Sequence, residues 1–462
     1  MKHDARRRVK SGYLATSIPT IIALLSILAI AFGCGEGGPE ENSADPAPVS
    51  SLSLLKADIE RENPTVDDAT LDELVADMTS FALWMYKQGV AQIGTDKNFL
   101  ISPLSISTAF GMLWPGAKGE TADEIAQMLH FRMEADRFHP AANRLDQVLA
   151  SRNDYEPSEG EGEAPVLETV NDLWGLKEYP YVDGFLDLLA RHYGAGMWQV
   201  DFIHAPEEAR QEINAYIAQQ TRDLIPELLP PGFIEQSTRL VLTNAIYFKG
   251  AWRAPFDLNR TSDGPFTAIG GNTADVQMMS DAVSGSYAAL EGVEVVELSY
   301  VGNDLSMVLI LPAESTFADF EAGLDAARIS DIMNALAPKG GFLAMPRFKF
   351  DAKLNLLKIF EDAGFSVPFD PQFADFSGLS EIALEERLHV SGAFHRAAIA
   401  VDEEGTEAAA ATAIGVGGVT STEEKDVFNV RLDRPFLFVI RDRPTGTILF
   451  MGRMVDAAAA QS

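Results

Sequence analysis

One run near the end of the chain limits the possible folds more than any other. Residues 402–413 read Asp-Glu-Glu-Gly-Thr-Glu-Ala-Ala-Ala-Ala-Thr-Ala, between an apolar, strand-like segment at 397–401 and a Gly-, Val-, Thr- and Ser-rich stretch. A second apolar strand is predicted at 435–440. Side chains alternate between the two faces of a strand. If residues 405–416 became extended, one face would carry only uncharged side chains: Thr406, Ala408, Ala410, Thr412, Ile414 and Val416. The run therefore resembles an exposed loop, yet one of its faces can enter a sheet without burying a charge.

A short helix or a passive linker is the alternative interpretation of the same run. Alanine is the best helix former, but Gly405 and the glycines within 415–418 bracket the alanines closely. Fewer than about ten residues lie between these breakers, too few for a stable isolated helix. We therefore expect an exposed segment that can become a strand.

Other motifs follow one another along the chain and, together with the run at 403–412, resemble the serpin family over residues 71–456. They are Asn98-Phe-Leu-Ile-Ser102-Pro103-Leu-Ser105-Ile106, Asn171-Asp-Leu-Trp174-Gly175, Thr243-Asn244-Ala-Ile-Tyr-Phe-Lys249-Gly250-Ala-Trp252, Met345-Pro346-Arg347-Phe348, Arg434-Pro-Phe-Leu-Phe and Thr445-Gly-Thr-Ile-Leu-Phe-Met-Gly452-Arg453. Helices are predicted at 181–193 and 206–221, and strands at 306–311 and 341–350; helices early in the chain and strands later agree with an α+β class. By resemblance, the motifs at 171–175 and 243–252 are strands of the central sheet. The resemblance implies the serpin fold, with a helical N-terminal part, three β-sheets and an exposed reactive loop at about 403–426.

The resemblance also assigns roles to individual residues. Asn244 and His395 lie in or beside apolar runs, where an unpartnered polar group would be costly; without the resemblance they could be unrelated core residues. By similarity, Trp252 belongs to the breach, where the loop first enters the sheet. The expected hinge is Glu403, Glu404, Gly405, Thr406, Glu407, Ala408, Ala409, Ala410, Ala411 and Thr412. The expected shutter, a polar cluster beneath the opening of the sheet, is Asn98, Ser102, Ser105, Asn244 and His395.

A covalent trap for a serine protease is the function that the resemblance implies. The protease attacks the loop and forms an acyl-enzyme on its own serine, and the cleaved loop then inserts as a strand into the central sheet. About 12 residues at roughly 3.3 Å each would carry the protease on the order of 40 Å. The native form is then a kinetic trap. A non-inhibitory serpin acting as a binding or chaperone-like module is the nearest alternative. An enzyme is not expected, because no catalytic motif stands out.

The bond that the protease cleaves is expected between Val419 and Thr420. Serpins place it about 17 positions into the run that begins at the first hinge glutamate, here Glu403. Counting back from Arg434 gives a position several residues later. Thr420–Ser421 and Val416–Gly417 are the other candidates. A small β-branched residue such as Val419 suits the narrow apolar pocket of an elastase-like protease.

The N-terminus has the features of a targeting segment. Basic residues at 6–10 precede a mostly apolar stretch at 18–32, the pattern of a secretory signal peptide over residues 1–33. Cys34 is the only cysteine and follows this stretch directly, as a bacterial lipid acceptor would. Ordinary secretion and an uncleaved signal anchor are the alternatives. Residues 34–70 resemble an acidic flexible tether. We expect an exported protein, extracellular or periplasmic, that contacts a membrane only through a lipid anchor.

Charge excludes some partners. The formal net charge of −32 argues against nucleic acid binding. Between residues 133 and 150, where some serpins have a basic helix for glycosaminoglycans, only Arg137 and Arg144 are cationic. The histidines are scattered without metal-ligand spacing. We expect a monomer that needs no cofactor or metal and whose partner is a serine protease.

Overall fold

The computed structural model describes residues 52–406 and 427–461. The predicted signal peptide (1–33), Cys34 and the predicted scissile pair Val419 and Thr420 lie outside these ranges. So do the hinge positions after Thr406, namely Glu407, Ala408, Ala409, Ala410, Ala411 and Thr412. Within the described residues, no helix is long and apolar enough to cross a membrane.

Nine α-helices occur in the described ranges, most of them in the first half of the chain. Polar N-caps set the starts of some of them: Asp67 accepts a hydrogen bond from Thr70 N, and Ser102 caps a helix that has Pro103 in its first turn. The helices are α1 (Asp68–Ile93), α2 (Pro103–Leu113), α3 (Gly119–Met128), α4 (Ala135–Ala150), α5 (Asp183–Leu188), α6 (Pro206–Gln220), α7 (Phe317–Ala322), α8 (Ala326–Ala335) and α9 (Leu356–Asp362).

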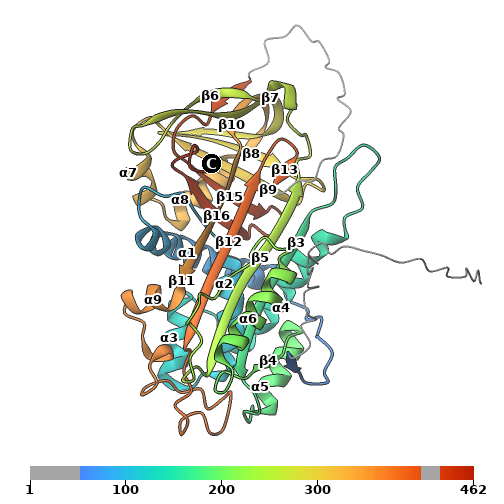
Figure 1. Ribbon diagram of the computed structural model, residues 1–462. Coiled ribbons are helices and arrows are strands. Elements are labelled where there is room, and N and C mark those ends of the chain that lie inside the picture. The colour runs from blue at the N-terminus through green and yellow to red at the C-terminus, as the bar shows by residue number, and fades with distance from the viewer. Residues whose placement is uncertain (1–51, 407–426, 462) are drawn as a thin grey trace, which may run out of the picture. The chain divides into compact units, whose positions relative to one another are not determined.

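A seven-stranded sheet forms the centre of the described domain (Figure 1). Its strands in spatial order are β1 (Ser53–Leu55), β4 (Met197–Val200), β3 (Val166–Leu176), β5 (Leu240–Ala251), β13 (Gly405–Thr406), β12 (Gly392–Val401) and β11 (Phe348–Asn355). The side chains of β5 are buried along nearly its whole length. Such continuous burial requires both faces of the sheet to be covered.

The second sheet has nine strands. Along the sheet lie β14 (Phe428–Arg431), β10 (Ala337–Pro346), β7 (Thr273–Leu290), β8 (Val293–Ser299), β9 (Leu305–Pro312), β15 (Phe436–Asp442), β16 (Ile448–Met454) and β2 (Phe99–Ile101), and β6 (Ser262–Thr267) pairs with β7. The α+β class is confirmed. The resemblance implied three sheets, but the described strands form two. The 18-residue strand β7 pairs with β6 near its start and with β8 near its end, and in this way it joins the strands around both partners into a single sheet.

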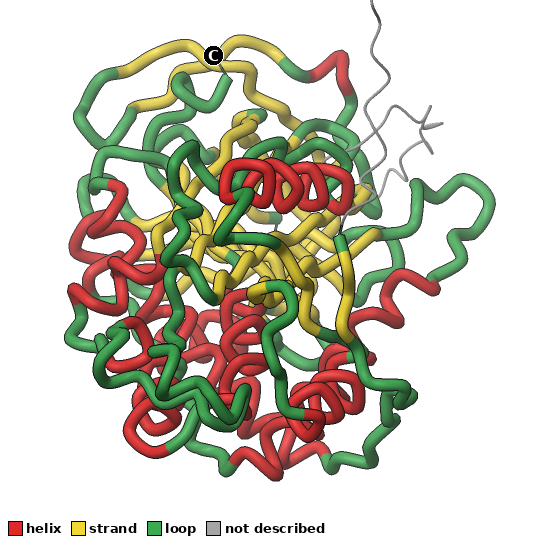
Figure 2. The backbone as a smooth tube through the Cα atoms, turned by 60° about the horizontal axis from the view of Figure 1, so that its bottom comes forward, coloured by secondary structure: helices red, strands yellow, loops and turns green. Residues whose placement is uncertain are grey.

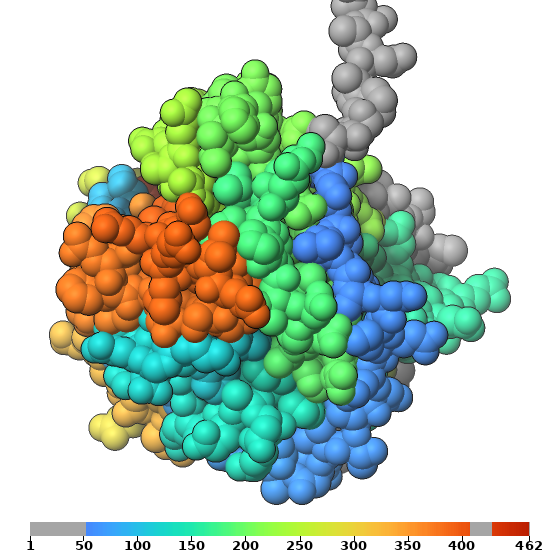
Figure 3. All heavy atoms as spheres, turned by 90° about the horizontal axis from the view of Figure 1, so that it is seen from below, coloured from blue at the N-terminus to red at the C-terminus, as the bar shows by residue number. Residues whose placement is uncertain are grey.

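Helices cover the two faces of the seven-stranded sheet. On one face α2 contacts β3 and β5 and also β16 of the other sheet. On the opposite face, Ala209, Ile213 and Ile217 of α6 pack with Trp174 of β3 and Val241 of β5. Figure 2 shows most helices gathered toward one end of the strands. Seen from below in Figure 3, the orange segment after β11 lies against the cyan helices, where Lys118 N donates to Asp375 O.

The described part of the predicted tether is attached to the domain. Strand β1 pairs antiparallel with β4, with Leu55 opposite Met197. Further along, Arg61 Nε donates to Asn143 Oδ1 (2.8 Å), and Glu62 N donates to Arg191 O (2.9 Å). Helix α1 already begins at Asp68. The polar composition suggested a flexible tether over 34–70, but residues 52–70 follow the surface of the domain or belong to it, because their backbone finds partners there.

Candidate functional site

The predicted hinge begins inside the seven-stranded sheet. Strands β5 and β12 pair directly and in parallel, from Val241 with Gly392 to Ala245 with Arg396. Beyond these pairs, strand β13 lies between them and runs antiparallel to both. Thr406 is opposite Gly250 of β5 and Val401 of β12. The sheet is therefore closed at its lower part, and its upper end holds the first two residues of a further strand.

A tight turn joins β12 to β13. The Asp402 carboxylate accepts hydrogen bonds from Glu404 N (2.9 Å) and Gly405 N (3.2 Å), and Asp402 N donates to Gly405 O (2.9 Å). Burial raises the pKa of Asp402, and the two backbone donors oppose that shift. A Cβ atom at Gly405 would lie 2.1 Å from Gly250 O. Only glycine permits this close approach of the hinge to β5.

Aromatic side chains hold Thr406, the second residue of β13. The Thr406 side chain is buried, and its hydroxyl shares a 2.7 Å hydrogen bond with the Tyr300 hydroxyl. The Tyr300 ring stacks on Trp252 at 4.7 Å between centroids. Trp252 in turn donates from Nε1 to Asp402 O (3.0 Å) and from its backbone N to Glu404 O (2.8 Å). Trp252, the residue predicted for the breach, thus lies against the turn that joins β12 to β13.

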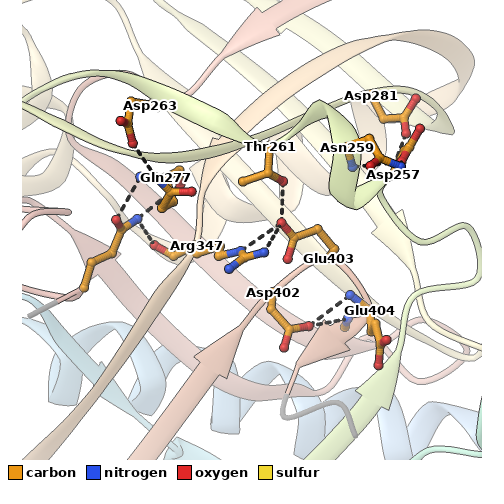
Figure 4. Close-up of polar contacts among 12 residues, drawn as sticks. Asp257, Asn259, Thr261, Asp263, Gln277, Asp281, Arg347, Asp402, Glu403 and Glu404 are labelled. Atoms are coloured by element: carbon orange, nitrogen blue, oxygen red, sulfur yellow. Dashed lines mark hydrogen bonds and ion pairs between the residues drawn. The ribbon is translucent and has the colours of Figure 1, made fainter. Parts of the chain in front are cut away.

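Glu403 anchors the turn through a buried ion pair. Its side chain is only 6% exposed, and the Arg347 guanidinium donates to Oε1 from Nε (2.8 Å) and NH2 (2.5 Å). Thr261 Oγ1 donates to the same carboxylate oxygen, and Phe256 N donates to Glu403 O. Figure 4 shows these side chains converging from separate elements. The sequence identified Glu403 but not Arg347, Thr261 or Tyr300, which gave no local signal of a role at the hinge.

The polar cluster beneath the sheet joins Asn244 to His395. These residues are directly paired across β5 and β12, and His395 Nδ1 donates to Asn244 Oδ1. His395 Nε2 accepts from Ser102 N (3.1 Å). The Asn244 amide donates to Ser105 Oγ (2.6 Å) and to Asn171 Oδ1 (2.5 Å). Burial lowers the pKa of His395 to about 3, so the imidazole is neutral and can accept at Nε2.

Four of the five predicted shutter residues therefore share one hydrogen-bonded cluster. The structure differs for Asn98, which donates to Asp456 O (2.7 Å) and accepts from Val455 N and Asp456 N (both 2.9 Å). It precedes β2, whose partner β16 leads into residues 455 and 456, so its nearest partners lie there. Asn171 takes a place in the cluster instead, although the sequence indicated only its strand.

The described residues contain no group of three or more His, Cys, Asp or Glu side chains that could hold a metal ion. In this part of the chain, the candidate site consists of the predicted hinge residues 403–406, Trp252, and the polar cluster around Asn244 and His395, all on or beside the seven-stranded sheet.

Comparison with known proteins gives concordant matches. The family model described as Serpin (serine protease inhibitor) matches residues 76–457. A leukocyte elastase inhibitor of Equus caballus is 35% identical over 394 residues, covering 83% of this chain and 99% of the relative. A serpin-like protein of Methanosarcina acetivorans is 34% identical over 378 residues, covering 81% of this chain and 86% of the relative.

A solved structure shows the same fold. The thermophilic serpin tengpin in its native state aligns with a TM-score of 0.74 and 24% identity, covering 88% of this chain and 99% of tengpin. Uncleaved ovalbumin aligns with a TM-score of 0.71 over 83% of this chain.

Proposed function

The chain belongs to the serpin family of protease inhibitors, and from that premise we propose that it traps a serine protease covalently by inserting its cleaved loop into the seven-stranded sheet. It would act as a one-use monomeric inhibitor and not as an enzyme. The protease would attack the loop with its own serine and form an acyl-enzyme. Insertion would then move the attached protease and distort its catalytic site before the ester is hydrolysed.

The register of β13 is the observation that carries this proposal. Thr406 faces Gly250 of β5 and Val401 of β12. In antiparallel pairing, one step forward along β13 moves the paired position one residue back along both β5 and β12. Six residues on, Thr412 would meet Asn244 (250 less six) and His395 (401 less six). An inserting strand would therefore bring the Thr412 hydroxyl between Asn244 and His395. This hydroxyl could replace the side-chain hydrogen bond that these two residues lose when β5 and β12 separate.

Insertion has a clear driving force. Above the Ala245–Arg396 pair, β5 and β12 no longer pair directly with each other in the described ranges. A new strand between them would gain backbone hydrogen bonds on both sides, at a net gain of about 0.5–1.5 kcal/mol each. The predicted inner face, which carries Thr406, Ala408, Ala410 and Thr412, brings no charge into this interior. The uninserted form is then metastable, with a lifetime set by the barrier to opening.

We propose an elastase-like protease as the target. The small β-branched residue at the expected scissile bond, Val419–Thr420, supports this choice, as does the similarity to a leukocyte elastase inhibitor. Incubation with pancreatic elastase should give a complex that survives SDS, and mass spectrometry of the released C-terminal fragment should give Thr420 as its first residue. Cleavage without any complex would favour a non-inhibitory serpin.

Export and lipid attachment at Cys34 are part of the same proposal. They rest on the basic, apolar and small residues that precede this cysteine. Metabolic labelling with palmitate in a bacterial host tests them: wild-type protein should take up label, and Cys34→Ser should not. Equal labelling of the two would contradict lipid attachment at this residue.

A further inference from the structure

The chain passes from one sheet to the other at Arg347. Strand β10 of the nine-stranded sheet ends at Pro346, and β11 of the seven-stranded sheet begins at Phe348. Arg347 N still donates to Gln277 O (3.0 Å), which continues the pairing of Pro346 with Met278. The Arg347 carbonyl thus lies between the last backbone pair of β10 and the first backbone pair of β11. As a backbone acceptor at this position, it needs a hydrogen-bond partner from outside the two strands.

Residues near the C-terminal end of the sequence supply this partner. Gln461 Nε2 donates to Arg347 O (2.7 Å) and to Gln277 O (3.2 Å), and Gln461 Oε1 accepts from Gln277 N (2.8 Å). One side-chain amide therefore bridges the backbones of Gln277 and Arg347, which also lie beside each other in Figure 4. The neighbouring Ala460 is buried, and its carbonyl accepts from Lys349 N (2.9 Å).

The same arginine holds the hinge. The Arg347 guanidinium makes the ion pair with Glu403, whose side chain is 6% exposed, whereas the Arg347 side chain is 36% exposed. A long, partly exposed side chain loses conformational freedom when it pairs, and fixing its backbone reduces that loss. Glu403 precedes Gly405, where the inserted strand begins. Its ion pair with Arg347 therefore holds the turn directly before β13.

We propose that Gln461 is a positioning residue for loop insertion: it fixes the Arg347 backbone so that the guanidinium keeps Glu403, and hence Gly405 and Thr406, in register between β5 and β12. The proposal rests on the trapping function proposed above. Insertion competes with hydrolysis of the acyl-enzyme, so a hinge that starts out of register lets more inhibitor be cleaved without trapping. Within the described ranges, the side-chain hydrogen bonds of Gln461 go to Gln277 and Arg347, so its effect on the hinge would pass through Arg347.

Amide hydrogen exchange tests the positioning step without any protease. In Gln461→Ala, the amides of residues 402–406 should exchange at least threefold faster than in the unsubstituted protein. The matched control is Gln236→Ala. Gln236 is also exposed, and it lies just before Leu240, at the end of β5 that is far from β13. Unchanged exchange at 402–406 in Gln461→Ala would overturn the proposal, whether or not the protein inhibits a protease.

A double-mutant cycle on the partition between complex and cleaved inhibitor tests the link to trapping. Gln461→Ala should raise the number of inhibitor molecules consumed per trapped elastase at least twofold, with an unchanged association rate. In the Arg347→Met background, Gln461→Ala should have no further effect. Independent, additive effects would mean that Gln461 only stabilises the fold, and would overturn the proposal. If the unsubstituted protein forms no complex, the trapping function fails, and the exchange experiment still decides the role of Gln461.

Discussion

Asn244 and His395 are hydrogen-bonded to each other across the two strands that must separate if the loop inserts. They close the lower part of the sheet while β13 occupies its upper end. The pair also contacts the start of α2, through the backbone N of its N-cap Ser102 and through Ser105 Oγ. Opening the sheet at this point requires breaking buried hydrogen bonds, and under the proposed mechanism this requirement would set the lifetime of the native form.

Removing the Asn244 side chain should shorten that lifetime. Asn244→Ala deletes the bonds to His395, Ser105 and Asn171 and leaves buried polar groups without partners. Each such group costs about 1–3 kcal/mol. We expect faster loss of inhibitory activity during incubation at elevated temperature, with conversion to an uncleaved inserted form. Activity that decays at the wild-type rate would show that this pair does not restrain the sheet.

A charge on the inner face of the hinge should convert the inhibitor into a substrate. Thr406 is buried against Tyr300, so Thr406→Arg would place a guanidinium in the sheet interior, where an unpaired charge is strongly disfavoured. Cleavage by elastase should persist while the SDS-stable complex disappears. Glu407→Arg, on the alternate face in an extended strand, is the control and should keep most trapping. An unchanged complex yield in Thr406→Arg would contradict insertion.

Stability should fall as the pH falls below 6.5, in part because of His139. Burial lowers the pKa of His139 from 6.5 to about 3, so the unfolded chain takes up a proton that the native state excludes. The free energy of unfolding is therefore unaffected by His139 protonation above pH 6.5 and decreases as the pH falls from 6.5 toward 3. Between pH 7.5 and 5.5 the wild type should lose about 1.4 kcal/mol more unfolding free energy than His139→Phe, measured by urea denaturation. Parallel pH profiles would mean that this imidazole is not kept neutral by burial.

Asp172 should show the opposite pH dependence. One carboxylate oxygen accepts from Trp198 Nε1 (2.8 Å), and the other is buried without a hydrogen-bond partner among the described residues. Burial raises the pKa of Asp172 to about 6. Its native charge is therefore costly at pH 7, and this cost vanishes below the unfolded pKa of 3.8. Asp172→Asn should raise the unfolding free energy by about 3 kcal/mol at pH 7 and by less than about 1 kcal/mol at pH 4. An equal gain at both pH values would contradict this.

Motifs that lie within one segment were predictable from the sequence. The alternating pattern of the hinge placed Thr406 on the face that is buried, and the strands at 306–311 and 243–252 occur as β9 and β5. The helices expected at 181–193 and 206–221 also occur, although the first begins at Asp183 and continues as a π-helix over Leu189–Tyr193. Local periodicity and capping determine such elements.

Partners distant in the chain were not predictable. Arg347 and Glu403 are separated by 56 residues, and Tyr300 and Thr406 by 106. A lone arginine or tyrosine has no spacing that reveals which strand it will meet. The expected strand at 341–350 is in fact two strands in different sheets, because the chain changes sheet at Arg347. The attachment of residues 52–66 depends on backbone pairing with β4 and on contacts with α4. The polar composition of this segment predicts neither of them.

The melting temperature of the protein before and after a single cut in its loop tests the central claim most directly. If the cut loop becomes a strand between β5 and β12, its new backbone bonds should raise the melting temperature on the order of 20 °C. A metalloprotease such as thermolysin, which forms no acyl-enzyme that could be trapped, gives the nicked form for calorimetry once it has been removed. Nicked and intact protein that melt at the same temperature would contradict insertion, and the trapping mechanism with it.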